Sequence, residues 1–297
     1  VGAALAGAGS LHPRDAELRG AAVSQRPGRG RALVAEGARL ERGSVVLRES
    51  PAAAVPVSDE GLGPGGLAAE TALALRLWRA QAAEPREFWG LTGEMMDHGG
   101  ADPLLRRERA AVAAICALVL AARHGEAGDV ASIGGALFAW LGRVRVNAVA
   151  ITALEDHEGA MQTAKVSLAL YPKLATCVNH DCRPNALLRF DKDHVVELVV
   201  SAGAGVSSGD EVTISYGPCA SALQRADRRA ALLGQYGFDC QCSACGAAGR
   251  EDFSWRARAE KLDERARLAA ARGEWGEAVA ASALSLEQLR RGYAEGD

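Results

Sequence analysis

Apolar residues recur at spacings of three and four along the middle of the chain. This periodicity lines up apolar side chains on one helical face, so it predicts helices over residues 67–83, 104–124 and 131–146. Within the second stretch, residues 110–122 are almost wholly apolar and are flanked by arginines. A run of 13 residues is too short to cross a bilayer, so it predicts a buried helix.

Short runs of β-prone residues lie on both sides of these helical stretches. Residues 31–35 and 44–48 are separated by glycine-containing turn sequence, a pattern that predicts a hairpin. A second strand-rich region contains residues 186–190, 194–200 and 212–215. Helices lie between the two regions, so distant strands must pair, and no regular strand–helix–strand repeat recurs. The pattern predicts an α+β fold.

The two ends of the chain differ from this central region. Residues 1–27 are rich in glycine and alanine without a sustained period, so we expect a poorly ordered lead-in or the tail of a truncated module. A helix is predicted over about 220–235. Residues 253–293 hold two amphipathic helical stretches whose junction, at 273–278, is similar to that of tetratricopeptide repeats. A single copy of this junction fits a simple helical hairpin equally well.

Composition narrows the classes of partner. The 297 residues carry 34 Lys+Arg against 37 Asp+Glu, a net charge of −3, which excludes a broadly basic surface for nucleic acid. With 48% hydrophobic residues, the chain can bury a core without covalent staples. We expect a monomer that neither binds nucleic acid directly nor spans a membrane.

The seven cysteines, an odd number in a chain of this size, do not suit a disulfide framework. They indicate a reducing compartment, the cytoplasm or the nucleus. Three of them lie in the sequence Cys240-Gln-Cys242-Ser-Ala-Cys245, and zinc takes four tetrahedral ligands, so a fourth must come from elsewhere. Cys182 is the first candidate, although free cysteine more often packs as a small hydrophobe. Cys177 or Cys219 could replace it, whereas Cys116 is expected in the core.

Several motifs, in this order and spacing, resemble those of SET-domain protein methyltransferases. They are Gly28-Arg-Gly-Arg-Ala-Leu-Val-Ala35, Gly43-Ser-Val-Val-Leu-Arg-Glu49, Arg143-Val-Arg-Val-Asn147, Leu170-Tyr-Pro172, Asn179-His-Asp-Cys-Arg-Pro-Asn185, Gly209-Asp-Glu-Val-Thr-Ile-Ser-Tyr216 and Gln235-Tyr-Gly-Phe-Asp-Cys-Gln-Cys-Ser-Ala-Cys245. More narrowly, they are similar to the SET-and-MYND branch, in which an Asn-His-Ser-Cys loop and a post-SET cysteine knuckle share a zinc ion. The resemblance covers about residues 28–246.

This resemblance implies an architecture and an activity. It implies a SET-domain β-clip core over 28–218 with a helical insertion at about 67–146, a post-SET helix and zinc knuckle over 219–249, and a helical C-terminal region over 250–297. It implies an enzyme that transfers a methyl group from S-adenosylmethionine to a lysine of a protein or peptide, histone or not. The zinc ligands that it implies are Cys182, Cys240, Cys242 and Cys245.

The resemblance also assigns residues to the site. Tyr216 matches the catalytic tyrosine, whose hydroxyl orients the lysine amine. Tyr236 and Phe238 match the wall of the substrate channel, and Phe238 also offers a face to the adenine, although both rings fit ordinary packing on the knuckle. The residues assigned to cofactor binding are Arg29, Gly30, Arg31, Asn147, Asn179, His180, Tyr216 and Phe238.

Three of these assignments have simple structural alternatives. Gly30 fits a hairpin bend, Asn147 fits a helix C-cap, and His180 fits a hydrogen-bonded structural histidine. Asn185 and Glu211 are expected to act structurally, by fixing the loop that threads against the last strand.

The chain also departs from the family pattern. Asp181 stands where the family has serine, Ala32 replaces the second glycine of the opening motif, and the stretch over 173–178 is one residue longer than usual. No cysteine lies between Glu49 and Cys116, so we expect no MYND finger there and no partner binding through one. Two other hypotheses remain: a non-catalytic SET-like scaffold with a cofactor pocket impaired at Asp181, and a zinc-binding interaction module.

Overall fold

The chain divides into two compact units. The first contains the residues up to 180 together with 185–214 and 234–238, and the second contains 181–184, 215–233 and 239–297. The structure, a computed structural model, describes residues 16–57, 67–83, 95, 103–124, 130–157, 160–220, 223–246 and 254–296. None of the helices in these ranges is long and apolar enough to cross a membrane.

A four-stranded antiparallel sheet joins the two strand-rich regions of the first unit. Its order is β1-β4-β10-β9, with bounds β1 Glu17–Leu18, β4 Val45–Glu49, β10 Val196–Val200 and β9 Ala186–Phe190. Leu47 of β4 pairs with Leu198 of β10, and both side chains are fully buried. The expected pairing of distant strands is therefore confirmed.

The predicted hairpin between residues 31–35 and 44–48 is wrong. Strand β3 (Gly30–Ala35) pairs instead with β2 (Ala21–Arg26), which lies within the stretch expected to be poorly ordered. That expectation is wrong for residues 17–26, and residues 1–15 lie outside the described ranges. Half of the β2 side chains are exposed and none is fully buried, so their apolar pattern carries no strand signal, whereas the pairing itself is made by the backbone.

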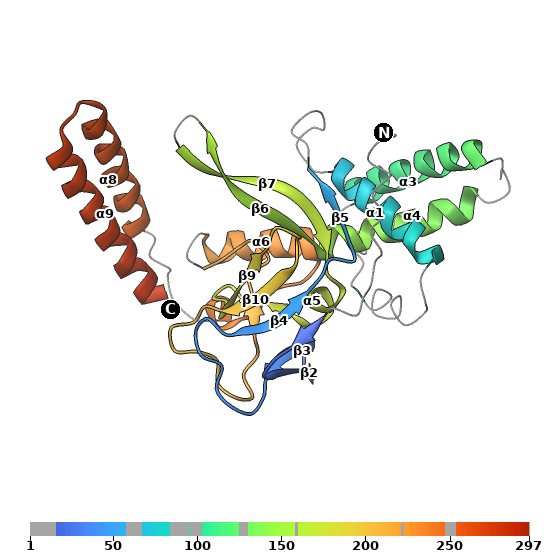
Figure 1. The fold of residues 1–297 in the computed structure, drawn as a ribbon, viewed down its shortest axis with the longest axis horizontal. Coiled ribbons are helices and arrows are strands. Elements are labelled where there is room, and N and C mark those ends of the chain that lie inside the picture. The colour runs from blue at the N-terminus through green and yellow to red at the C-terminus, as the bar shows by residue number, and fades with distance from the viewer. Residues whose placement is uncertain are drawn as a thin grey trace. The chain divides into compact units, whose positions relative to one another are not determined.

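Three further strands and a parallel pair complete the first unit's sheets. A three-stranded antiparallel sheet has the order β5-β7-β6, with bounds β5 Ala53–Pro56, β6 Ala148–His157 and β7 Ala160–Leu170. Its long β6–β7 hairpin, visible in Figure 1, was not predicted by the apolar pattern. The parallel pair joins β8 (Asn179–His180) to β11 (Thr213–Ile214).

The three helices predicted in the middle of the chain are confirmed to within a residue. They are α1 Leu67–Ala83, α3 Pro103–His124 and α4 Val130–Asn147. Helix α4 packs against both α1 and α3, and fully buried Leu73, Leu77 and Trp140 form a core that extends to β5 and β7. Separate sheets and an inserted helical layer confirm the α+β class.

The apolar run at 110–122 is buried on one face only. Ala113 and Ala117 are buried, whereas Ile115 and Leu118 are 61% and 58% exposed in the described part of the chain. The prediction of a buried helix therefore holds for one face of this helix and not for the other. The buried face contains Leu120 together with the alanines, so small and large apolar side chains both contribute to the packing.

A short helix places the Asn179–His180 strand. Helix α5 (Pro172–Cys177) begins at a proline, and the carboxylate of Glu49 accepts the backbone N–H groups of Lys173 at 2.7 Å and Leu174 at 2.8 Å. These bonds satisfy donors that a helix start leaves open. Burial raises the pKa of Glu49 to about 7, in spite of the opposing effect of the two bonds.

The second unit is mainly helical. Helix α6 (Arg225–Tyr236), which begins later than predicted, is followed by α7 (Ser243–Gly246) in the cysteine knuckle. Helices α8 (Ser254–Ala271) and α9 (Trp275–Gly296) pack together as a hairpin, which confirms the two predicted helices. Buried Ser285 of α9 donates to the Ala259 carbonyl of α8 at 3.3 Å.

Candidate functional site

Asn179 ties the parallel β8–β11 pair to strand β3. Its side-chain amide donates to the Arg31 carbonyl at 2.9 Å and to the Glu211 carboxylate at 2.8 Å. Asn179 pairs with Thr213 in β11, so three segments that are distant in sequence meet at this residue. The Asn179 side chain is therefore engaged within the protein.

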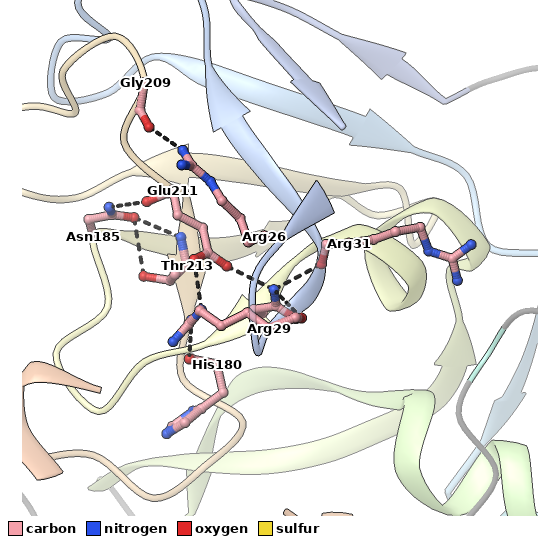
Figure 2. A network of polar contacts seen from close by, with 9 residues as sticks. Arg26, Arg29, Arg31, His180, Asn185, Gly209, Glu211 and Thr213 are labelled. Atoms are coloured by element: carbon pink, nitrogen blue, oxygen red, sulfur yellow. Dashed lines mark hydrogen bonds and ion pairs between the residues drawn. The ribbon is translucent and has the colours of Figure 1, made fainter. Parts of the chain in front are cut away.

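Glu211 is the centre of this network, drawn in Figure 2. One carboxylate oxygen accepts from Asn179, and the other lies 2.8 Å from Nε of Arg29, whose Nη2 donates to the His180 carbonyl at 3.0 Å. Glu211 has an exposed side-chain fraction of 16% and Arg29 one of 33%, so solvent screens the pair only in part. The ion pair holds the β2–β3 turn against the His180 backbone.

The guanidinium groups around the β2–β3 turn bind the chain itself. Arg26 donates to the Gly209 carbonyl, and Arg31 donates through Nε to the Thr176 carbonyl at 3.2 Å. Gly28 and Gly30 have φ values of +72° and +69°, which L side chains rarely adopt, so the bend itself requires these glycines. A ligand that binds along this turn would contact the backbone of the turn more than the guanidinium groups of the arginines.

Asn185 completes the network, as expected for a structural residue. Its amide donates to the Glu211 carbonyl at 2.8 Å, and its side-chain oxygen accepts the Thr213 N–H at 2.8 Å. Figure 2 shows Asn185, Glu211 and Thr213 on facing segments. The structural roles expected for Asn185 and Glu211 are confirmed.

Three rings of the first unit form an aromatic row. The His180 ring centroid lies 6.2 Å from that of Phe238, and the Phe238 centroid lies 6.4 Å from that of Tyr236. His180 is only 4% exposed, whereas Tyr236 and Phe238 are half-buried. Burial raises the pKa of the Tyr236 hydroxyl, so this phenol stays neutral at physiological pH.

Asn147 closes the last turn of α4. Its side-chain amide donates to the Arg143 carbonyl at 2.7 Å, four residues earlier, which is the C-cap role expected as the alternative to ligand binding. The side chain is half-buried. A cap also fixes where α4 ends and β6 begins.

Tyr216 follows β11 and belongs to the second unit. It lies in a turn in which Ser215 Oγ accepts the Gly217 N–H and donates to the Pro218 carbonyl, both at 3.1 Å. Its side chain is half-buried.

The structure gathers four buried cysteines of the second unit. The sulfur atoms of Cys182, Cys240, Cys242 and Cys245 all lie within 4.8 Å of one another. Cys182 Sγ lies 3.6 Å from that of Cys245 and 3.9 Å from that of Cys240. A tetrahedral zinc ion with Zn–S bonds of about 2.3 Å separates its sulfurs by about 3.8 Å, so the donor set fits zinc.

Backbone and thiol contacts hold this cluster together. The Cys242 carbonyl accepts the Cys245 and Gly246 N–H groups at 2.9 and 2.8 Å, and the Cys182 carbonyl accepts the Ala220 N–H at 2.7 Å. The hydrogen bond from the Cys182 thiol lowers the pKa of Cys242 to about 3, and the same bond raises the pKa of Cys182. The site is arranged for thiolate sulfur, the form that binds metals.

The two alternative ligands lie outside this cluster. Cys177, in the first unit, is buried and donates to the Lys173 carbonyl at 2.9 Å. Cys219 is half-buried and does not belong to the four-sulfur group found among the described residues. Cys116 is half-buried and packs against the helical core, as expected.

Arg228 lies beside the cysteine cluster and was not identified from the sequence. It is fully buried on α6, and its Nη1 donates to the Leu223 carbonyl at 2.6 Å. Nη2 lies 3.8 Å from the Cys245 sulfur. No sequence signal marks Arg228, because arginine is usually exposed and Arg228 is one of three arginines within residues 225–229.

A family model described as the SET domain matches residues 79–217, a segment that ends one residue after Tyr216. The chain is 40% identical over 85 residues to a SET and MYND domain-containing protein of Dictyostelium discoideum, covering 29% of this chain and 23% of that one. It is 30% identical over 130 residues to the protein-lysine N-methyltransferase SMYD4 of Mus musculus, covering 41% of this chain and 16% of the other.

Two further similarities extend this set. The histone-lysine N-methyltransferase ATXR2 of Arabidopsis thaliana is 41% identical over 78 residues, covering 26% of this chain and 16% of that protein. A solved structure, the SET domain of LSMT bound to lysine and AdoHcy, has 15% identity and a TM-score of 0.45, covering 74% of this chain and 53% of that one. The chain thus spans less than a quarter of the length of these curated relatives.

Proposed function

We propose that this chain, which carries a SET domain similar to those of SET and MYND domain proteins, is a methyltransferase that uses S-adenosylmethionine to methylate protein lysines. The observation that carries the proposal is the Glu211 junction. It ties the β2–β3 turn to Asn179 and His180, directly before the strand that leads to Tyr216. Asn179, His180 and Glu211 of the junction, and Tyr216, lie within residues 79–217, which the SET-domain model matches.

The cofactor is assigned to the surface formed by the β2–β3 turn and the β8 strand. S-adenosylmethionine supplies an electrophilic methyl group on a sulfonium centre. The backbone over Arg29, Gly30 and Arg31 would lie along its methionine part, because the arginine head groups are engaged elsewhere. Asn147 would bind its amino-acid end. Because the Asn179 amide is engaged within the protein, the backbone of Asn179 is assigned to the adenosine end, and His180 with Phe238 would present ring surface to the adenine.

The lysine must reach the methyl group as a neutral amine. A free lysine has a pKa of about 10.4, so an apolar channel that disfavours the ammonium form is needed at physiological pH. Tyr236 and Phe238 are assigned to the wall of that channel. Tyr216 is assigned the catalytic role, in which its hydroxyl accepts a hydrogen bond from the amine and aligns the nitrogen for in-line attack.

The four cysteines are assigned to a structural zinc ion. A set of four thiolates leaves no open position on the metal, so this site is suited to holding the knuckle rather than to chemistry. The zinc would join Cys182 to the segment over 240–245, and so would fix the chain on both sides of the Tyr216 turn in sequence.

The remaining assignments follow from the same proposal. The substrate is a protein or peptide lysine, the compartment the cytoplasm or the nucleus, and the chain a monomer without direct nucleic-acid binding. The domain scheme is a SET domain over 28–218, a post-SET segment over 219–249 and a helical region over 250–297. We also assign the last of these to a tetratricopeptide-like helical pair.

Asp181 favours an enzyme over a scaffold with an impaired pocket. Its carboxylate accepts the Arg183 N–H at 2.9 Å, a local turn contact that engages the charge within its own loop. An Asp181→Ser variant should therefore bind S-adenosylhomocysteine with an affinity similar to that of the wild-type chain.

Calorimetry with S-adenosylhomocysteine tests the proposal. We expect saturable binding with one site per chain, and Tyr216→Phe should bind about equally well because it keeps the ring assigned to the cofactor and removes only the hydroxyl that orients the amine. The absence of binding at high micromolar ligand would refute the enzyme and favour the scaffold. Metal analysis of the same sample separates a zinc-containing scaffold from a chain that holds neither group.

A further inference from the structure

Arg228 is a charged side chain with no exposure to solvent, and such a group must be compensated inside the protein. Its Nη1 donates to the Leu223 carbonyl at 2.6 Å, and its Nη2 lies 3.4 Å from the Ala244 carbonyl. Both carbonyls are neutral. They orient the guanidinium, but they do not balance its charge.

The sulfur atoms of the cysteine cluster can balance this charge. Nη2 of Arg228 lies 3.8 Å from the sulfur of buried Cys245. The guanidinium therefore lies beside a sulfur of the cluster.

Four thiolates around one zinc ion leave a net charge of −2 in a buried site. Such a charge is costly in a medium of low dielectric constant unless a cation lies beside it. Arg229, the next residue, is a poor candidate, because it is exposed and binds Asp239 through two hydrogen bonds of 2.6 and 2.5 Å. Arg228 is the buried cation at this position.

We propose that Arg228 is the charge partner and positioning residue of a zinc–thiolate site, holding Cys245 in its ligating orientation and offsetting the negative charge of the occupied cluster. The inference rests on the cluster binding zinc, and it does not depend on methyl transfer. Outer contacts of this kind change metal affinity by about 10- to 100-fold when they are lost.

Zinc affinity, measured by competition with a chromogenic chelator under reducing conditions, tests this role. The wild-type titration first reports whether the cluster binds zinc at all, and methyl transfer is a separate assay. Arg228→Met, which removes the charge and keeps an apolar chain of similar length, should weaken zinc binding by about 10-fold or more. Arg229→Met, the matched control on the same helix, should stay within about twofold of wild type. Equal affinities for the two variants would overturn the proposal.

Two further measurements separate a charge role from simple packing. Arg228→Lys keeps the charge and should retain more zinc affinity than Arg228→Met, whereas equal losses would contradict the charge role. The melting temperature should fall in Arg228→Met for the zinc-bound protein but not for the protein stripped by chelator, because the full negative charge that the guanidinium offsets is present only when zinc holds the four sulfurs as thiolates. Equal decreases in both forms would show a packing role only. If Arg228→Met does not fold, Arg228→Gln is the neutral variant to use.

Discussion

Removing the charge of Glu211 tests whether the junction in Figure 2 holds the β2–β3 turn in place. In Glu211→Gln, one amide oxygen remains to accept either Asn179 or Arg29, and the amide NH2 then faces the other donor. The variant loses one charge-assisted hydrogen bond, whose net value is about 1.5–3 kcal/mol when buried. The 33% exposure of Arg29 reduces the expected loss to about 1–2 kcal/mol.

Thermal unfolding and cofactor binding both report this loss. A change of about 1–2 kcal/mol lowers the melting temperature of a chain of this size by about 2–6 °C. If the displaced turn binds the cofactor, the affinity for S-adenosylhomocysteine should also fall by about 10-fold, the equivalent of about 1.4 kcal/mol.

A second glutamate provides the control for this experiment. Glu17 forms an exposed ion pair with Arg19 at 2.8 Å, so Glu17→Gln should leave both the melting temperature and the affinity unchanged. Equal effects of the two variants, or an unchanged melting temperature in Glu211→Gln, would refute the role of the junction. A lower melting temperature with unchanged affinity would separate the fold from the proposed cofactor surface.

Three other predictions test the fold and the metal site. The pKa of Glu49 is raised to about 7 in the folded protein, so the native state binds a proton that the unfolded state loses. The free energy of unfolding should therefore fall by up to about 3 kcal/mol as the pH rises from about 4.5 to about 7, and Glu49→Gln should remove this dependence in denaturant titrations. Cys182→Ser should lower zinc content and the melting temperature, and Cys219→Ser should change neither; an unchanged zinc content in Cys182→Ser would show that the fourth ligand is wrong. Leu77→Ala, at a fully buried position, should lower the free energy of unfolding by about 2–5 kcal/mol in chemical denaturation. Leu118→Ala, at a position 58% exposed, should have little effect, and similar losses in the two variants would contradict the packing of the helical core.

Helices were predictable from the sequence because their signal is local. The periodicity over residues 67–83 and 131–146 gave α1 and α4 almost to the residue. Strand pairing is decided by contacts between distant residues, and here the pattern misled. It joined 31–35 to 44–48, whereas β4 pairs with β10, about 150 residues later in the sequence.

The candidate site was predictable from motifs, but the contacts of its side chains were not. The resemblance grouped Cys182 with the cysteines of 240–245, as the structure does. It also assigned Arg29 to the cofactor, and only the structure shows its guanidinium bound to Glu211. Arg228 gave no signal, because nothing in a sequence distinguishes a buried arginine from its exposed neighbours.

Transfer of a labelled methyl group from S-adenosylmethionine to a protein or peptide array tests the central proposal most directly. The wild-type chain should label a subset of lysine-containing targets, and Tyr216→Phe should lose that label while it still binds S-adenosylhomocysteine. Labelling that is equal in the two proteins, or absent from both in the presence of bound cofactor, would contradict a lysine methyltransferase that acts through Tyr216.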